Sequence, residues 1–436
     1  MAAMVEDYPE LHLTINLTPV LIMQLEELIT DYYEGNPTDR YVRLTLKPAE
    51  ELTPEDKKFL LLSFFSANWT NMIDIYPRYR ELREKRVFED GGIDLKRSLA
   101  NYTTQDYRDL QAWFNLAWFD PDFKRDEVKL PTGETVTVKP YIDKGIGFTE
   151  QDKQDIIDIQ FKILRAIIPI HKKLFSKNQI EVVTTPYYHP ILPLLYDNYL
   201  ATTSLPARHF AYPEDADAQV GLAVEKFETL FGKPPRGMWP AEGAVAKQVV
   251  PIFADHNIRW IATDEKVLAK SLKKDFVTPQ EKYKPYTATH KGKSINIIFR
   301  DTQLSDAIGF RYHSMNPQDA AFDLLSQLYS HYLRFKDREI PSVVVVILDG
   351  ENAWENYPND AKFFLKAMYE GLTSVDWLKT TTVSDYLSKF PPQDKLVDNL
   401  VPGSWINADL TTWIGEDEEN VAWNALTDLR ATVEEK

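Results

Sequence analysis

The sequence predicts an α/β fold in which helices cover a mainly parallel sheet, either open or closed into a barrel. Short β-type runs recur along the chain, and a helical pattern lies between most of them. The most regular run is Val-Val-Val-Val-Ile-Leu at 343–348, which is continuous and rich in β-branched residues. Such a run is typical of a strand that is buried on both faces, as the strands of parallel sheets are.

The elements are expected in a fixed order along the chain. Residues 11–17 alternate with the period of a strand, and Thr18 and Pro19 then begin an apolar helix that extends to about Tyr33. Further strands are predicted at 179–185, 237–239, 259–263, 294–300 and 341–349. Helical patterns between them are predicted at 216–231, 244–256 and 317–335.

Region 40–176 interrupts this alternation because its pattern is mostly helical. Thr149 has the form of an N-cap before a long helix, and a short polar hairpin is expected at 130–138. We therefore expect a barrel over 1–356 that carries a mostly helical insertion at about 40–176. A helical C-terminal region is expected over 357–436, packed on the barrel and ending in an acidic helix.

Composition excludes several classes of function. The formal charge of −16 results from 50 Lys and Arg against 66 Asp and Glu, and it disfavours a nucleic acid or an anionic membrane as partner. The absence of Cys excludes disulfides, thiolate nucleophiles and Cys-ligated metal centres. No apolar run approaches the roughly 20 residues that span a bilayer, and the acidic N-terminus is unlike a signal peptide. We expect a cytoplasmic protein, with secretion left open.

Acidic residues follow two of the predicted strands, where α/β barrels keep their active sites. Glu242 comes after a short strand and a Pro bend, and Asp349 and Glu351 come after the aliphatic strand. Trp239 and Trp354 lie within a few residues of these acids, and an aromatic face beside two carboxylates suits cleavage of a glycosidic bond. An alternative stays open, in which Glu242 caps a helix and Asp349 ends a strand at a turn.

A second polar group, Arg300, Asp301 and Asp306, follows another predicted strand and could either hydrogen-bond sugar hydroxyls or form structural salt bridges. His189 lies at the end of a further strand. No two His are three or four positions apart, so a local zinc motif is absent, although a metal held by dispersed ligands stays open. The sequence has neither a Gly-rich phosphate loop nor a nucleophile elbow, which argues against nucleotide-binding enzymes and serine hydrolases.

Two stretches resemble signature motifs of glycoside hydrolase family 57, in its amylopullulanase and α-amylase branch. They are Gly-Met-Trp-Pro-Ala-Glu-Gly-Ala-Val at 237–245 and Ile-Leu-Asp-Gly-Glu-Asn-Ala-Trp-Glu at 347–355. Residues 181–195, 299–310 and 403–415 are similar to further stretches of that family, in the same order. The resemblance extends from about residue 10 to the C-terminus.

This resemblance implies a retaining hydrolase or transglycosylase that acts on α-glucans such as starch, glycogen or maltooligosaccharides, on an incomplete (β/α)7 barrel, without a metal or other cofactor. By motif position, Glu242 is the nucleophile and Asp349 the general acid/base. Other residues expected in the substrate cleft are His189, Trp239, Arg300, Asp301, Asp306, Glu351, Trp354, Trp405 and Trp413. Hydrolysis and transfer are both found in the family, so the resemblance does not decide between them.

One feature of the family is missing from this sequence. The family begins with a strand that carries a His-Gln-Pro motif, and no such motif occurs here. We therefore expect a barrel without that first strand, in which residues 11–17 form an edge of the sheet. Two alternatives remain: a catalytically inactive, carbohydrate-binding relative, and a metal-dependent barrel of the deacetylase or α-mannosidase type.

Overall fold

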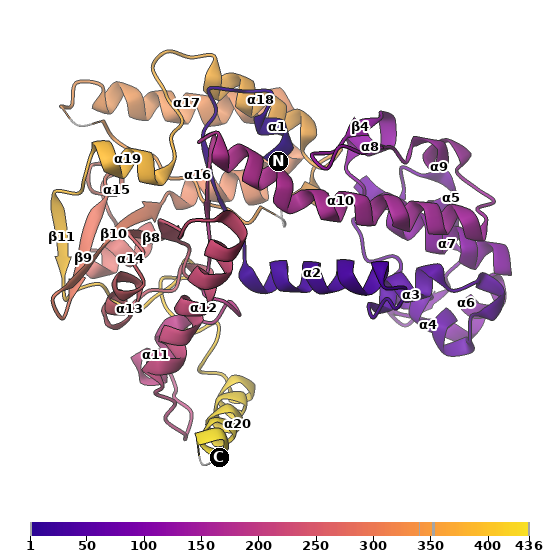
Figure 1. Cartoon of the computed structure of the whole chain (residues 1–436), viewed down its shortest axis with the longest axis horizontal. Helices are drawn as coiled ribbons and strands as arrows, with labels where there is room; N and C mark the ends of the chain where they lie inside the picture. Colours follow the sequence, from indigo (N-terminus) through magenta and orange to yellow (C-terminus); the bar gives the residue numbers. More distant parts are fainter. Residues whose placement is uncertain (1, 340, 351–353, 435–436) are drawn as a thin grey trace.

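The chain folds into two lobes in the computed structural model, which describes residues 2–339, 341–350 and 354–434. Figure 1 shows a larger lobe around the strands and a smaller lobe of helices, drawn in purple. Two helices extend from one lobe to the other: α2 (Pro19–Tyr33) and α10 (Glu150–Ser176). The smaller lobe therefore rests on helices that begin or end beside barrel strands.

Parallel strands form the centre of the larger lobe. They are β1 (Leu13–Asn16), β6 (Ile180–Val183), β7 (Gly237–Met238), β8 (Trp260–Asp264) and β10 (Lys293–Arg300). The strand β1 pairs with β6, β7 pairs with β8, and β8 pairs with β10, while a bridge from Thr184 to Met238 connects the two sheets. Each of these strands lies close to its predicted position, so the parallel α/β prediction is confirmed.

Two further strands extend the sheet beyond β10 and were not predicted. The strand β9 (Tyr286–His290) is antiparallel to β10, and β11 (Asp394–Val397) pairs with β9 in parallel. Within the described residues, β1 pairs with β6 alone. The ring of backbone hydrogen bonds is thus not closed in the part of the chain that the structure describes.

The predicted strand at 341–349 is not a regular strand in the structure. Val343 N–H donates to Tyr283 O (3.1 Å) and Asp301 N–H donates to Val345 O (2.7 Å), but Ile347 N–H donates to a side-chain hydroxyl. Only Val345 of the aliphatic run is buried, and the others are half-buried. The prediction of a strand buried on both faces is therefore wrong. The segment bonds to irregular backbone and to a side chain, and it has no regular ladder of backbone hydrogen bonds to neighbouring strands within the described residues.

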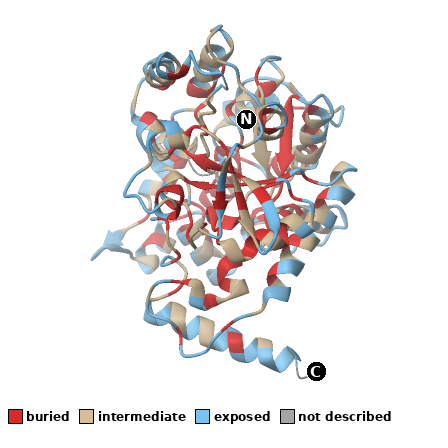
Figure 2. Ribbon diagram, turned by 90° about the vertical axis from the view of Figure 1, so that its left-hand side faces the viewer, coloured by how far each residue is buried: buried red, intermediate tan, exposed pale blue. Residues whose placement is uncertain are grey.

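Side chains of the strands alternate between the barrel interior and the surrounding helices. Val183, Ala262, Ile298 and Val345 pack together in one buried cluster, with half-buried Ile347 against it. The intervening residues of the same segments belong to clusters shared with helices. Figure 2 shows the buried residues concentrated on the strands and on the inner sides of the helices.

The smaller lobe is built mainly of helices. They are α3 (Arg40–Leu46), α4 (Pro54–Ser63), α5 (Pro77–Glu84), α6 (Leu95–Asn101), α7 (Thr104–Ala117), α8 (Pro121–Arg125), α9 (Lys139–Lys144) and α10. A capping box at Thr149 begins α10, as predicted. Two short hairpins, β2 (Phe88–Glu89) with β3 (Gly92–Ile93) and β4 (Val128–Lys129) with β5 (Thr135–Val136), interrupt the helices.

The larger lobe contains the remaining helices. Beside α2 they are α1 (Ala2–Val5), α11 (Leu192–Tyr196), α12 (Pro213–Phe231), α13 (Val250–Asp255), α14 (Glu265–Ser271), α15 (Pro279–Lys282), α16 (Thr302–Asp306), α17 (Pro317–Phe335), α18 (Lys362–Thr373), α19 (Val383–Lys389) and α20 (Asp417–Glu434). The helix predicted at 244–256 is shorter than expected. Its first residues are extended, because Val245 pairs with Gly403 in an antiparallel bridge.

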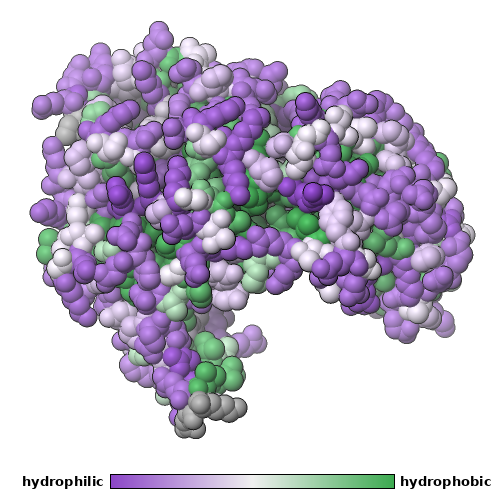
Figure 3. Space-filling model, viewed as in Figure 1, coloured by the Kyte–Doolittle hydropathy of each residue, from purple (hydrophilic) through white to green (hydrophobic). Residues whose placement is uncertain are grey.

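Surface polarity differs between the outer faces and the region between the lobes. On the face drawn in Figure 3 the periphery is mostly hydrophilic, and apolar side chains gather between the barrel and the helical lobe and along α20. Among the described residues, no helix combines the length and the apolar character needed to cross a bilayer.

Candidate active site

Glu242 lies on a strained turn directly after β7. A short 3-10 turn, Ala241–Gly243, places Glu242 at φ 56° and ψ 23°, in the left-handed region. Such a conformation costs a residue other than glycine about 1–3 kcal/mol and is found mainly where the surroundings enforce it. Gly243 follows at φ 60°, and a Cβ there would lie 2.9 Å from the Trp239 ring. The turn is therefore fixed by its neighbours.

The Glu242 carboxylate is held by one donor on each oxygen. The Nε2 of His189 lies 3.0 Å from Oε1, and the indole Nε1–H of Trp405 donates to Oε2 at 3.0 Å. The backbone N–H of Trp405 also donates to the carbonyl of Glu242 at 3.1 Å. Because the side chain remains 28% exposed, the carboxylate is oriented by the protein and still open to a ligand.

These contacts determine the charge of Glu242. The hydrogen bond from His189 lowers the pKa of the Glu242 carboxyl below its usual value, and the Trp405 bond acts in the same direction against the opposing effect of burial. Glu242 is consequently ionised at neutral pH. An ionised, oriented carboxylate can act as a nucleophile or stabilise a positive charge, but it cannot donate a proton.

His189 is held in an equally unusual conformation. Its φ is 57°, and its backbone N–H donates to the carbonyl of Pro186 at 2.9 Å, which closes a turn. An ionised carboxylate can only accept, so Nε2 of His189 carries the proton in this bond. The other ring nitrogen, Nδ1, is enclosed and has no hydrogen-bond partner among the residues that the structure describes. His189 thus contacts the Glu242 carboxylate directly, whereas the resemblance implied only a place in the cleft.

Asp349 lies at the end of the extended segment 341–349, on the side of the barrel where β7 delivers Glu242. It is half-buried, and it continues the alternation in which Val343, Val345 and Ile347 face the interior cluster. The segment is held in place just before it, because Arg300 Nε donates to Ile347 O at 2.8 Å. Glu351, the other acid predicted here, lies outside the described residues.

Arg300 connects three parts of the site and is itself only 6% exposed. Its Nη1 donates to Asp264 at the end of β8 (3.2 Å), and its Nη2 bonds Asp306 in α16. Its guanidinium also lies over the Trp405 ring, 5.2 Å from the centroid. Asp264 is fully buried and was not singled out from the sequence, although an acid directly after a predicted strand was a usable signal.

The other predicted residues differ in how near they lie to the carboxylates. Trp239 meets Trp405 edge to face (5.2 Å between centroids), and the Trp354 indole bonds the carbonyl of Gly350. Trp413 packs with the apolar cluster that includes Ala244, two residues after Glu242. Asp301 is 2% exposed and caps α16, and it also bonds Lys282 and Tyr283. This leaves Asp301 a structural position beneath the site.

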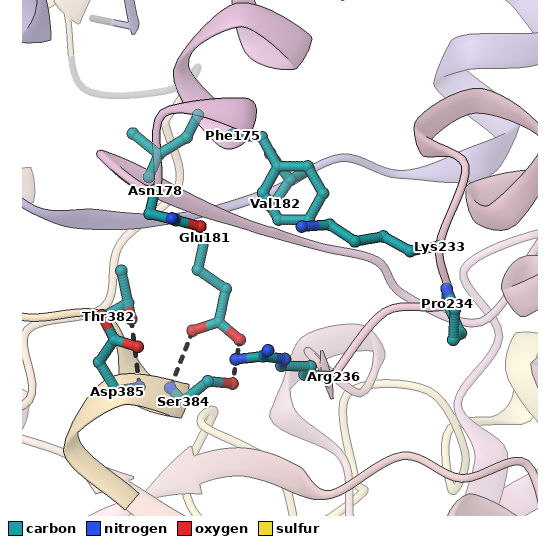
Figure 4. Close-up of a pocket in the computed structure, with 11 residues that line it drawn as sticks. Phe175, Asn178, Glu181, Val182, Lys233, Pro234, Arg236, Thr382, Ser384 and Asp385 are labelled. Carbon is teal, nitrogen blue, oxygen red and sulfur yellow. Dashed lines mark hydrogen bonds between the residues drawn. The ribbon is translucent and has the colours of Figure 1, made fainter. Parts of the chain in front are cut away.

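A small hollow at the opposite end of the strands contains the buried carboxylate of Glu181 (Figure 4). Glu181, near the start of β6, is 6% exposed and accepts hydrogen bonds from the Ser384 backbone (2.9 Å) and the Trp260 indole (3.1 Å). These donors fix the start of α19 to the barrel. Glu181 is therefore separated from Glu242 by the length of the strands. No group of three or more His, Asp or Glu with the geometry of a metal site occurs among the described residues.

An ionised, oriented carboxylate at the carboxyl end of a barrel strand, with a second acid at the end of a neighbouring segment, is typical of enzymes that act on glycosidic bonds. The chain belongs to glycosyl hydrolase family 57, whose family model matches residues 2–398. Membership places it among enzymes of the glycoside hydrolase type.

Curated relatives resemble part of the chain. A 4-alpha-glucanotransferase of Thermococcus litoralis is 23% identical over 254 residues, which is 57% of this chain and 32% of the relative. An alpha-amylase of Pyrococcus horikoshii is 25% identical over 231 residues, which is 52% of this chain and 31% of the relative. The match thus spans about a third of the length of each of these relatives.

Solved structures share the fold over nearly the entire chain. A family 57 branching enzyme of Pyrococcus horikoshii superposes with a TM-score of 0.54 at 16% identity, covering 97% of this chain and 69% of that one. A branching enzyme of Thermococcus kodakaraensis gives 0.50 at 13% identity, covering 96% and 78%. The fold is thus the (β/α)7-type barrel of this family, with its ring of strands open in the described residues.

Proposed function

We propose that this protein is a retaining enzyme that acts on α-1,4- or α-1,6-linked glucans, with Glu242 as nucleophile and Asp349 as general acid/base. The observation that carries the proposal is the Glu242 carboxylate, ionised and held on both oxygens by His189 and Trp405. A nucleophile must be ionised before substrate binds, and it must point in one direction. The names of the relatives, a glucanotransferase and two amylases, support α-glucans as the substrate class.

The reaction proceeds in two displacements. A Glu242 oxygen attacks the anomeric carbon while the bond to the leaving oxygen breaks, and Asp349 transfers its proton to that oxygen. This step leaves a sugar covalently bound to Glu242. Asp349, now ionised, takes a proton from water or from a sugar hydroxyl, which attacks the anomeric carbon and releases Glu242. Two inversions give net retention of configuration.

The surrounding residues have distinct parts in this scheme. His189 and Trp405 keep the carboxylate in the attacking orientation, and Arg300 fixes the backbone just before Asp349. The ring of Trp239 offers an aromatic face beside the nucleophile. A retaining pair requires carboxyl groups about 5–5.5 Å apart, against about 6.5–9.5 Å for an inverting pair. We expect Glu242 and Asp349 to meet at the shorter spacing.

Incubation with maltoheptaose tests this proposal. Shorter products alone indicate hydrolysis, a ladder of longer and shorter products indicates transfer, and NMR of the first product should show the α-anomer. Binding without turnover would instead favour a catalytically inactive relative. Loss of activity with a chelator would favour a metal-dependent barrel, and a β-anomeric first product would refute the retaining mechanism.

A further inference from the structure

The helical lobe touches the segment that follows Asp349. A short π-helix, Trp69–Ile73, lies against residues 354–356. The Nδ2 of Asn71 donates to Glu355 O at 3.1 Å, and the Nδ2 of Asn68 donates to the side-chain oxygen of Asn356 at 3.2 Å. Two side-chain amides thus join the lobe to residues more than 280 positions away in the sequence, beside the proposed acid/base.

Trp69, in the same π-helix, is exposed and yet held in one orientation. Its side chain is 44% exposed, while its indole N–H donates to Phe65 O at 3.3 Å. The guanidinium of Arg83 covers one face of the ring, 4.6 Å from the centroid. Arg83 is itself fixed by Asp74, which accepts from its Nε at 2.9 Å. The guanidinium of Arg86 also lies over the ring, 5.5 Å from the centroid, so two cations hold the indole while part of its surface stays exposed.

The chemistry around this indole suits a sugar. The Trp69 indole offers apolar area to a sugar ring at little entropic cost, because its orientation is already fixed. The carboxamides of Asn68 and Asn356 bond each other at the start of the same π-helix, and amides can both donate to and accept from hydroxyl groups. A π-helix is itself a rare element that is frequent at functional sites.

We propose that Trp69 binds a glucosyl unit of the α-glucan on the leaving-group side of the cleaved bond. This inference rests on the proposed function, because it places Asp349 at the leaving oxygen. Sugar units beyond that oxygen then extend from Asp349 along residues 354–356, where Asn68 and Asn71 hold the π-helix. A chain long enough to reach Trp69 binds more tightly than a short one, and the same surface retains an acceptor glucan for transfer.

Binding to an inactive background tests this surface separately from turnover. In a Glu242→Gln protein, affinity should rise from maltotriose to maltoheptaose, measured by calorimetry. Trp69→Ala should remove most of this gain, a loss of about three- to tenfold for a single aromatic contact, and leave maltotriose binding unchanged. Trp69→Leu preserves apolar bulk if the alanine variant is unstable. Phe276→Ala removes another exposed aromatic ring, 76% accessible and beyond α14, and serves as the matched control.

Each outcome decides between the two proposals. If Trp69→Ala and Trp69→Leu bind maltoheptaose as tightly as their parent, the inference is refuted, even when the enzyme is active on starch. If the parent protein neither binds nor converts any maltooligosaccharide, the proposed function fails, and the inference fails with it. An equal loss for maltotriose and maltoheptaose would assign Trp69 to the structure of the lobe and would also overturn the inference.

Discussion

Replacing Trp405 by Phe removes one donor from the Glu242 carboxylate while keeping an aromatic ring against Trp239. A hydrogen bond to a charged group contributes about 1.5–3 kcal/mol. Less than a third of the Glu242 side chain is exposed, so solvent weakens this bond only in part. If the bond holds Glu242 in its attacking orientation, kcat/KM should fall roughly ten- to a hundredfold.

The pH dependence of the same variant should change in a defined direction. The Trp405 bond helps to lower the pKa of Glu242, so its removal raises that pKa toward the ordinary carboxyl value. The acid limb of the kcat/KM profile, measured on an aryl maltoside, should therefore move to higher pH. Trp377→Phe is the matched control, because the Trp377 ring packs against Tyr329 and Tyr332 of α17. An unchanged rate together with an unchanged acid limb would refute the assigned role of Trp405.

Three other predictions follow from the same structure. Glu242→Gln should abolish turnover, whereas Asp349→Ala should keep part of the activity on an aryl glucoside whose leaving group needs no proton; equal losses on both substrates would contradict the division of roles. Gly237→Ala should destabilise the protein by about 1–3 kcal/mol or more in a denaturant titration, because its Cβ would lie 1.9 Å from the buried indole of Trp260. A Cβ at Gly309 would meet nothing within 4 Å, so Gly309→Ala is the control and should be neutral. The ion pairs and the helix cap of Asp106 lower the pKa of its carboxyl to about 2. Its contribution to stability should therefore be present above about pH 4 and be lost as the pH falls toward 2. If Asp106→Asn unfolds in acid as the wild type does, this prediction is contradicted.

Sequence patterns predicted the parallel strands and the long helices because these depend on local periodicity. Helix α2 begins and ends at the expected residues, and α10 begins at the expected cap. The antiparallel strand β9 was missed, since its pairing with β10 depends on a tight turn at 290–293 rather than on hydrophobic alternation. The segment 343–348 was predicted as a doubly covered strand from its composition, but the ladder depends on neighbours that composition does not specify.

The candidate site was predictable in part. Acids at strand ends indicated Glu242 and Asp349, and the family motifs indicated His189 and Trp405. That both of these residues would bond the Glu242 carboxylate could not be read from the chain, because they lie 53 and 163 positions away from it. The contact of the lobe with residues 354–356 is equally non-local, so Trp69 carried no signal in the sequence.

The left-handed backbone conformation at Glu242 reduces the stability of the protein at a residue that the proposed activity requires. A glycine would adopt φ 56° without the cost that a glutamate bears there, so the relief of strain in Glu242→Gly should offset much of the stability lost with the bonds from His189 and Trp405, while all turnover is lost. His189, at φ 57°, presents the same conflict on the other side of the bond. Mutants selected only for thermal tolerance should therefore tend to lose this pair, and a screen for stabilised variants must measure activity alongside melting temperature.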